Sequence, residues 1–303
     1  MKIIFFGTSK FAAEILQFLV QKKLSILAVV TQPDKPKGRS QKVSESPVKE
    51  ISKKYLPNSP LFQPAQASDP VFIEQMKNLR PDLFVVVGFG QILKEELLQV
   101  PRIAPINVHA SLLPKYRGAA PIQRCLMAGE AKSGITLIHM TKDLDAGDIL
   151  GVAEVAISQD MTAGELTEKL MQAAKPLLLR VIDKLPKGVK QDGTKATYAK
   201  KLAAEEFQIF WDFPAEQIHN RIRALSPKPG AFSYLHINQE KKRLKILKST
   251  LSSKKGEAPG QIFPPMIVIC KDGAIEIQEV QLEGKKAMSC QEFLKGVQGK
   301  IFF

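Results

Sequence analysis

KIIFFG (2–7) opens the chain, FAAEILQFL (11–19) follows it, and LSILAVVT (24–31) comes next. The first and third runs are short and apolar, with many β-branched or aromatic residues, which is typical of buried strands. The middle run repeats its apolar residues with helical spacing. The order strand, helix, strand predicts a parallel sheet that helices cover.

The same alternation continues to about residue 185. We expect further strands at 82–87, 105–109, 134–140 and 149–157, and helices at 71–79, 94–98 and 163–185. Strands that alternate with helices indicate an α/β class with a Rossmann-like, mostly parallel sheet. The sequence therefore predicts an N-terminal domain over residues 1–185.

The composition changes after this point. Residues 186–203 are rich in Lys, Gly, Gln and Thr and lack apolar periodicity, which is typical of a linker. An amphipathic helix is expected at 214–225, and alternating strands are expected at 231–237, 242–247, 261–270 and 274–281. We expect a smaller C-terminal, OB-like β-barrel domain over 204–303, with a Lys/Ser-rich mobile loop at 249–256.

Charge suggests a polyanionic partner, because the 303 residues carry a formal net charge of +14 at pH 7. Two basic clusters stand out. The first is Lys35, Lys37, Arg39 and Lys42, and the second is Lys241, Lys242, Arg243 and Lys245, followed by Lys248. Two such patches could bind one long anion, although a solvated charge run is the simpler interpretation of the first cluster alone.

Three cysteines, Cys125, Cys270 and Cys290, are too widely spaced for a CxxC pair or a disulfide framework. This pattern favours a reducing cytoplasm. The apolar N-terminal run is too short for a signal peptide, and we expect no membrane span and no membrane partner.

Two polar residues lie at the carboxyl end of the strand expected at 105–109. A strand turns Asn107 and His109 to the same face with α-carbons about 6.7 Å apart. An amide donates to a developing oxyanion, and an imidazole exchanges protons near neutrality. Asp145 would orient His109, although Asp143 and Asp148 stand nearby and any of the three is also a turn former.

One glycine turn also lies at the carboxyl edge of the expected sheet. Gly7, Thr8 and Ser9 join the first strand to the first helix, without a full GxGxxG pattern or a Walker lysine. A tight turn is the simpler interpretation, and a place beside a ligand crevice is the alternative.

The chain resembles the formyltransferases that use 10-formyltetrahydrofolate. The resemblance is carried by Asn107-x-His109 with Ser111-Leu112-Leu113-Pro114, and by Asp145-x-Gly147-Asp148 downstream. Three further stretches resemble the tRNA-directed branch: Thr31–Lys35 running into Gly38-Arg39, Ser46–Lys49, and Gly284–Ser289.

The resemblance implies transfer of a formyl group from 10-formyltetrahydrofolate to the α-amino group of methionine on initiator tRNA, for translation initiation. It implies catalytic roles for Asn107, His109 and Asp145, and no metal. It places the folate on Ser111, Leu112, Leu113 and Pro114, with the pterin beside Phe89, Gly90, Gln91, Ile92 and Leu93. It assigns the first basic cluster to the tRNA acceptor arm, with Arg39 as the main contact, and we expect a monomer.

Two other functions stay open. A formyltransferase for an amino sugar or glycinamide ribonucleotide would keep Asn107, His109 and the loop 111–114, but it would not need two basic clusters. A non-catalytic RNA-binding protein would need only the charge, so Asn107→Ala would leave its binding unchanged.

Overall fold

The structure is a computed structural model that describes residues 1–37, 42–238, 240–297 and 301–303. The chain divides into two compact units, and neither is a single stretch of sequence. The first unit comprises Met1–Gly118, Gly134–Val155 and Lys169–Tyr198, and the second comprises Ala119–Ser133, Ala156–Glu168 and Ala199–Phe303. Segments 186–198 and 199–203 of the expected linker therefore belong to different units.

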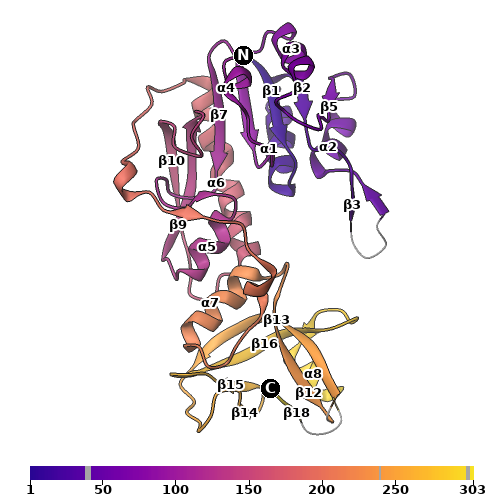
Figure 1. Ribbon diagram of the computed structural model, residues 1–303, viewed down its shortest axis with the longest axis vertical. Helices are drawn as coiled ribbons and strands as arrows, with labels where there is room; N and C mark the ends of the chain where they lie inside the picture. The colour runs from indigo at the N-terminus through magenta and orange to yellow at the C-terminus, as the bar shows by residue number, and fades with distance from the viewer. Residues whose placement is uncertain (38–41, 239, 298–300) are drawn as a thin grey trace. The chain divides into compact units, whose positions relative to one another are not determined.

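The first unit is built on a seven-stranded sheet in the order β10-β9-β7-β6-β1-β2-β5 (Figure 1). The sheet strands are β1 (Lys2–Gly7), β2 (Ser25–Val30), β5 (Leu61–Phe62), β6 (Leu83–Val87), β7 (Ala104–His109), β9 (Lys132–His139) and β10 (Ile149–Ala156). Five strands from β7 to β5 run parallel, and β9 pairs antiparallel with β7. The predicted α/β class with a mostly parallel sheet is confirmed.

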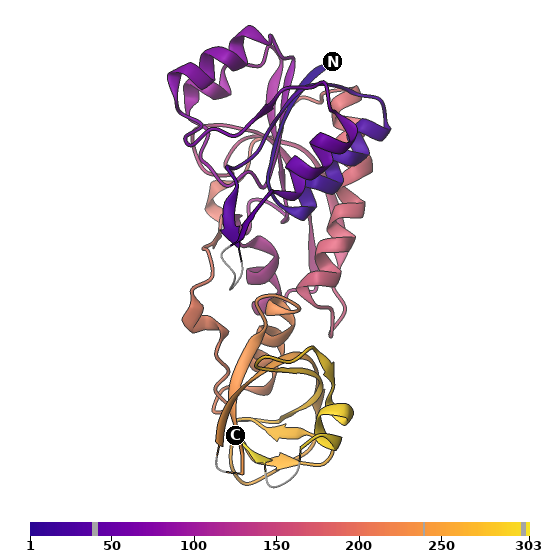
Figure 2. The same cartoon turned by 90° about the vertical axis from the view of Figure 1, so that its right-hand side faces the viewer.

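Helices cover both faces of this sheet. They are α1 (Lys10–Gln21), α2 (Pro47–Tyr55), α3 (Pro70–Asn78), α4 (Glu95–Leu98) and α6 (Ala163–Asp183). Figure 2 shows α1 and α6 on one side of the sheet and α3 on the other. Because both faces are covered, β1 and β6 are buried almost throughout, and Phe6 packs against Phe84 and Phe89 in the core between the sheet and α3.

The second unit contains an antiparallel sheet in the order β14-β15-β16-β13-β12-β18, with β17 paired to β16. Its strands are β12 (Ala231–Ile237), β13 (Glu240–Ser252), β14 (Ile262–Phe263), β15 (Ile267–Ile269), β16 (Ala274–Leu282), β17 (Met288–Ser289) and β18 (Ile301–Phe302). Its helices are α5 (Pro121–Met127), α7 (Ala215–Leu225) and α8 (Cys290–Lys295). The sheet curls around a core that includes Ile218, Leu244 and Ile275 (Figure 2).

Two expected elements of this unit differ from the structure. The strand expected at 261–270 is divided into β14 and β15, because Pro264 and Pro265 cannot donate backbone N–H groups to a ladder. The loop expected at 249–256 begins too early, since β13 continues to Ser252 and pairs with β16. Ser249 is buried there and shares a hydrogen bond with His219, which composition alone does not reveal.

Several short elements were not expected from the sequence. They are β3 (Lys35–Lys37), β4 (Lys42–Ser44), β8 (Arg117–Gly118), β11 (Tyr198–Ala199), and the 3₁₀ turns Gly193–Lys195 and Ala204–Phe207, together with β5, β17, β18, α2, α5 and α8. The start of α2 carries a clear local signal, because Ser46 caps the N–H of Lys49 and Pro47 follows the cap.

Two kinds of feature are absent from residues 1–37, 42–238, 240–297 and 301–303. None of the helices there combines the length and the apolar character needed to cross a membrane. In the same ranges no three His, Cys, Asp or Glu side chains gather in a group that could hold a metal ion.

Candidate active site

Asn107 and His109 lie at the carboxyl end of β7, between β6 and β9. Asn107 pairs with Val86 of β6 and with Ile138 of β9, so the strand direction at this point is fixed from both sides. His109 is only 6% exposed. A crevice outside the carboxyl ends of parallel strands is the usual place for a ligand in such a sheet.

The carboxylate of Asp145 contacts both side chains. The Asn107 amide donates from Nδ2 to Asp145 Oδ1 at 3.2 Å, and His109 Nδ1 lies 3.5 Å from Asp145 Oδ2. The backbone N–H of Gly118 also donates to Oδ2 at 2.8 Å. The structure therefore brings together the three residues proposed for catalysis, and of the three neighbouring aspartates it is Asp145 whose carboxylate joins Asn107 to His109.

Both ring nitrogens of His109 face acceptors in the protein. Nε2 lies 2.9 Å from the backbone carbonyl oxygen of Tyr116, which fits an Nε2–H donor. An imidazolium would donate to the Tyr116 carbonyl and toward the Asp145 carboxylate at the same time. Asn107 differs, because its amide nitrogen has two hydrogens and the bond to Asp145 uses one of them.

The Asp145 turn (residues 143–148) joins β9 to β10 and is held tightly. His139 N donates to the carbonyl of Asp148 at 2.9 Å. Asp145 has a φ of +50°, in the left-handed region that few non-glycine residues adopt and that aspartate tolerates better than most. A Cβ on Gly147 would stand 1.7 Å from the carbonyl oxygen of His139, so only glycine fits at this position.

The loop predicted to contact folate, 111–114, is also anchored to the protein. Thr136 Oγ1 donates to the carbonyl of Ser111 at 2.7 Å and accepts from the N–H of Leu113 at 3.1 Å. Ser111 Oγ donates to the carbonyl of Lys115, and Ser111 and Leu113 are buried. Leu112 packs against Gly134, whose missing Cβ leaves it room. Hydrogen bonds and burial therefore fix the position of the loop, and its contact with folate stays a prediction.

The second predicted folate segment, Phe89 to Leu93, divides by environment. Phe89 and Leu93 are buried in the core. The Gln91 side chain accepts from Ala67 N at 2.6 Å and donates to the backbone carbonyls of Pro64 and Ala65. It therefore fixes the loop at 64–67. Ile92 is 80% exposed, and such an apolar side chain is the one in this segment most available to a ring-shaped ligand.

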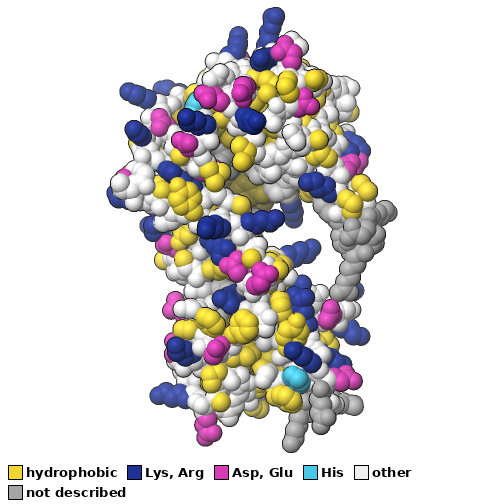
Figure 3. All heavy atoms as spheres, in the orientation of Figure 1, with side chains coloured by type: hydrophobic (Ala, Val, Ile, Leu, Met, Phe, Trp, Pro, Cys, Tyr) yellow, Lys and Arg dark blue, Asp and Glu magenta, His cyan; other side chains and the backbone are white. Residues whose placement is uncertain are grey.

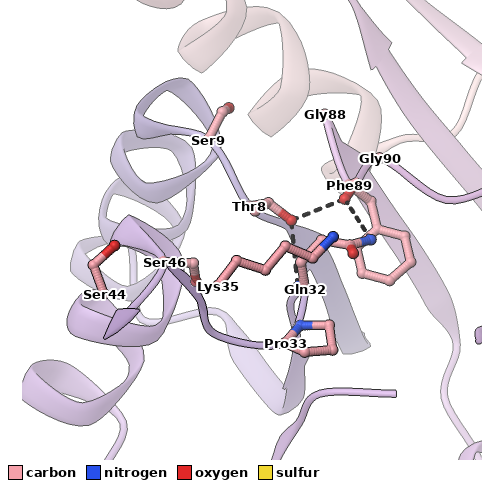
Figure 4. Close-up of a pocket in the computed structure, with 10 residues that line it drawn as sticks. All are labelled: Thr8, Ser9, Gln32, Pro33, Lys35, Ser44, Ser46, Gly88, Phe89 and Gly90. Atoms are coloured by element: carbon pink, nitrogen blue, oxygen red, sulfur yellow. Dashed lines mark hydrogen bonds between the residues drawn. The ribbon is translucent and has the colours of Figure 1, made fainter. Parts of the chain in front are cut away.

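A cavity of about 370 Å³ opens beside this segment (Figure 4). Its lining residues come from three connections at the carboxyl edge of the sheet and from both strands of the β3–β4 hairpin with the residues that follow it: Thr8, Ser9, Gln32, Pro33, Lys35, Ser44, Ser46, Gly88, Phe89 and Gly90. Thr8 Oγ1 and Gln32 Nε2 both donate to the carbonyl of Phe89, at 2.8 and 3.2 Å. Figure 4 shows Lys35 extended across the cavity toward Gln32 and Phe89. The glycine turn at 7–9 thus borders a cavity, the alternative considered from sequence.

The first basic cluster lies on the basic hairpin (residues 35–44), formed by β3 and β4. Figure 1 shows β3 projecting away from the sheet of the first unit. Lys35 is exposed along one edge of the cavity, whereas Lys37 and Lys42 are placed only by their backbone pairing. Arg39, the main predicted tRNA contact, lies outside the described residues.

Polar contacts fix the root of the basic hairpin. Lys49 Nζ pairs with Asp34 Oδ2 at 2.5 Å and donates to Gln63 Oε1 at 3.0 Å. Gln63 Nε2 donates in turn to Asp34 Oδ1 and to the carbonyl of Gln32. The hydrogen bond from Lys49 is the largest cause that lowers the pKa of Asp34 below its ordinary value. The hairpin therefore leaves the sheet from a defined point.

The second basic cluster lies on β13 and is divided by the strand period. Lys241, Arg243 and Lys245 share one face, and Lys242 shares the other with buried Leu244. Lys241 Nζ lies 4.3 Å from the centre of the Tyr234 ring, and the Arg243 guanidinium lies 3.7 Å from that of Phe232. Lys242 pairs with Glu240, and Lys245 donates to the carbonyl of Pro229. Both ammonium groups therefore already have a partner within the protein.

Lys and Arg side chains also cover other parts of the surface. On the face in Figure 3 they are spread over both units rather than gathered at the two clusters alone. The net positive charge therefore creates a general attraction for polyanions, and the two clusters are its densest stretches in sequence.

Sequence reasoning missed two residues near the Asp145 turn. Arg117 and Gln191 are both 8% exposed, and their side chains join each other and the turn. Gln191 lies in the segment expected to be a linker, and it bonds to a residue 46 positions earlier in the chain. No periodicity or motif marks such a contact.

Comparison with known proteins identifies the family of this chain. Residues 1–182 match the formyl transferase family, and residues 201–298 match the formyl transferase C-terminal domain. The chain belongs to the formyl transferase family. Among its curated relatives is the methionyl-tRNA formyltransferase of Protochlamydia amoebophila, which is 43% identical over 305 residues, covering 98% of this chain and 95% of the relative.

Solved structures show the same fold at low identity. Methionyl-tRNA formyltransferase from Clostridium thermocellum superposes with a TM-score of 0.59 at 20% identity, covering 91% of this chain and 98% of that one. The N-formyltransferase from Helicobacter canadensis, in complex with folinic acid and dTDP-3-aminofucose, gives a TM-score of 0.68 at 21% identity, covering 94% and 100%.

Proposed function

We propose that this chain transfers a formyl group from 10-formyltetrahydrofolate to the α-amino group of methionine on initiator tRNA, giving N-formylmethionyl-tRNA. One observation carries the proposal. The side chains of Asn107 and His109 converge on the carboxylate of Asp145, at the carboxyl end of β7, in a chain that is 43% identical to a methionyl-tRNA formyltransferase over nearly its full length.

Asn107 is the proposed electrophilic donor. As the amine nitrogen bonds to the formyl carbon, the formyl oxygen becomes negative, and fixed N–H donors stabilise that charge. The second N–H of Asn107 is the group that serves this purpose, because Asp145 holds the first one and thereby orients the amide. When the bond from carbon to N10 breaks, the proton lost by the amine is balanced by one gained at N10.

His109 is the proposed second donor, with Asp145 as its partner. Nε2 faces the Tyr116 carbonyl at 2.9 Å, so donation from this nitrogen to the formyl oxygen requires that oxygen to replace the carbonyl. The Asp145 carboxylate stabilises the imidazolium and, directly or through water, accepts the amine proton. Hydrogen bonds at catalytic groups commonly rearrange when substrate binds.

The two substrates are proposed to meet at the carboxyl edge of the first unit. Residues 111–114 and 89–93 would hold the folate, with exposed Ile92 against its ring system. The cavity beside Phe89 and Gly90 reaches Lys35 of the basic hairpin, so the folate segment and the proposed tRNA segment border the same space.

The remaining assignments are also proposals. Residues 1–185 would carry the catalysis, with 204–303 binding tRNA through Lys241, Arg243 and the rest of the β13 cluster. The basic hairpin would contact the acceptor arm. The enzyme would act as a monomer in the cytoplasm, and light scattering of the purified protein, alone and with tRNA, tests the monomer.

The decisive assay supplies 10-formyltetrahydrofolate and measures release of tetrahydrofolate and formation of the formylated product. The acceptors are methionyl-initiator tRNA, the same tRNA without methionine, a dTDP-amino sugar and glycinamide ribonucleotide. Product with methionyl-tRNA alone supports the proposal. Turnover of either small amine at a comparable rate would replace it with a small-substrate formyltransferase.

A binding-only protein gives a different result in the same experiment. It would retain tRNA on a filter or in a gel but release no tetrahydrofolate, and Asn107→Ala would bind as the parent does. A large loss of turnover in Asn107→Ala, with tRNA retention unchanged, separates the enzyme from this alternative.

A further inference from the structure

A buried polar chain runs from Arg117 through Gln191 to the Asp145 turn. Arg117 donates to Gln191 Oε1 from Nε at 3.2 Å and from Nη2 at 2.7 Å. Both side chains are buried. Two guanidinium donors on one oxygen fix the amide orientation, because a flipped amide would present its N–H groups to a cation.

The amide nitrogen of Gln191 completes the chain. Nε2 donates to the backbone carbonyls of Asp145 at 2.8 Å and Gly147 at 2.7 Å. The amide thus accepts two hydrogen bonds on one side and donates two on the other, which uses both of its N–H groups. It holds the turn at two points, one on each side of Ala146.

The turn needs this support at Asp145, because the carboxylate of that residue contacts Asn107 and His109. Asp145 holds a left-handed backbone conformation with φ of +50°, which aspartate adopts more readily than most residues but which lies outside the ordinary helical and extended regions. A small rotation of this residue would move both carboxylate oxygens, and with them the contacts to Asn107 Nδ2 and His109 Nδ1. Misplacement of a reacting group by about 1 Å costs up to a hundredfold in rate.

We infer that Gln191 is a positioning residue for formyl transfer, which holds the Asp145 carboxylate against Asn107 and His109 while Arg117 fixes its amide. The inference rests on the proposed function. It assigns Gln191 no contact with substrate, so its loss lowers kcat and leaves the KM values for both substrates within about threefold.

The test uses the full-length chain and two variants of Gln191. Gln191→Met keeps the length of the side chain and removes all four hydrogen bonds, and Gln191→Glu keeps the pairing with Arg117 but has no N–H for the turn. Each is expected to lower kcat by about ten- to a hundredfold. Lys190→Ala, an exposed neighbour on the same segment, is the control and keeps the parental kcat.

Combination with Asp145→Asn distinguishes positioning from a merely structural role. Asparagine tolerates the left-handed backbone but supplies no carboxylate. If Gln191 acts through that carboxylate, Gln191→Met added to Asp145→Asn lowers the residual kcat by less than about twofold. A full further loss in the double variant overturns the inference.

The outcomes separate the inference from the proposed function. Failure of the parent to formylate methionyl-tRNA overturns the proposed function. A parent that turns over normally beside Gln191→Met and Gln191→Glu with parental kcat overturns only the positioning role. If Gln191→Met fails to fold, which its thermal unfolding shows, Gln191→Glu alone decides the question, because it retains the buried contact with Arg117.

Discussion

The Asp145 turn and the basic hairpin are both short connections in the first unit, and they are built in opposite ways. The turn has a left-handed Asp145, a Gly147 with no room for a side chain, and carbonyls held by Gln191. The hairpin is held at its root by Asp34 and Lys49, and Lys35 beyond the root is exposed. Fixed geometry suits the placement of reacting atoms, whereas exposed cations suit a long and variable anion.

The largest effect is expected from loss of the Asn107 amide, which the Asp145 turn orients. This variant tests the turn's half of the comparison. Asn107→Ala removes an oxyanion donor and is expected to lower kcat by about a hundredfold or more. Steady-state kinetics with methionyl-tRNA checks this, and equilibrium binding of folate should be unchanged. Near-parental kcat would remove Asn107 from the chemistry.

A single methyl group in the turn should produce the next largest effect. Gly147→Ala would place Cβ against the carbonyl of His139 and is expected to lower the free energy of unfolding by roughly 2 to 3 kcal/mol. It should also lower kcat about tenfold or more, because the Asp145 carboxylate moves. Denaturant unfolding measures the first effect and initial rates the second.

Gly193→Ala is the matched control for the methyl group. Nothing lies within 4 Å of the position its Cβ would take, so the free energy of unfolding should change by less than about 0.5 kcal/mol. Equal destabilisation by the two alanines would mean that Gly147 is not constrained as described.

The basic hairpin should respond in KM rather than kcat. Arg39→Ala is expected to raise KM for methionyl-tRNA about tenfold and to reduce the salt dependence of tRNA binding by about one charge, while folate binding is spared. Filter binding at several salt concentrations checks the slope, with Lys190→Ala as the charge-matched control. A parallel loss of folate affinity would contradict the assignment of this hairpin to tRNA.

The smallest effect is expected at the root of the hairpin. Lys49→Met removes the cation beside Asp34, so the pKa of Asp34 should rise toward its ordinary value, because the hydrogen bond from Lys49 is the largest of the causes that lower it. Carboxyl NMR titration measures this directly, and KM for tRNA should rise by no more than about threefold. An unmoved Asp34 titration would show that the pairing does not hold the hairpin root.

The sequence was sufficient for all strands of the central sheet except the two-residue edge strand β5, because longer buried strands leave a strong local signal. The apolar runs at 2–7 and 82–87 fall on β1 and β6, and the strand period places Asn107 and His109 on one face. The basic hairpin has no such signal, since β3 and β4 are short and charged. The strand expected at 261–270 is divided at Pro264 and Pro265. The alternation of apolar residues on which that expectation rested gives no sign of the missing backbone N–H groups.

The active-site turn was only partly predictable. Three aspartates near residue 145 fit a turn equally well, and contact with Asn107, 38 residues earlier, distinguishes them only in the folded chain. Gln191 had no distinguishing pattern at all, because its environment is made by residues about 45 and 74 positions away. Long-range polar contacts of this kind carry no local periodicity.

The interleaving of the two units affects the order in which the chain completes them during synthesis. Helix α5 is made early, yet Arg223, which donates to the carbonyl of Leu126 in that helix, comes 97 residues later. At the rates of ribosomal synthesis this separation is roughly 5 to 20 seconds. A nascent chain that stops near residue 200 therefore presents α5 and residues 156–168 without the partners that bury them, and a chaperone would find these segments exposed.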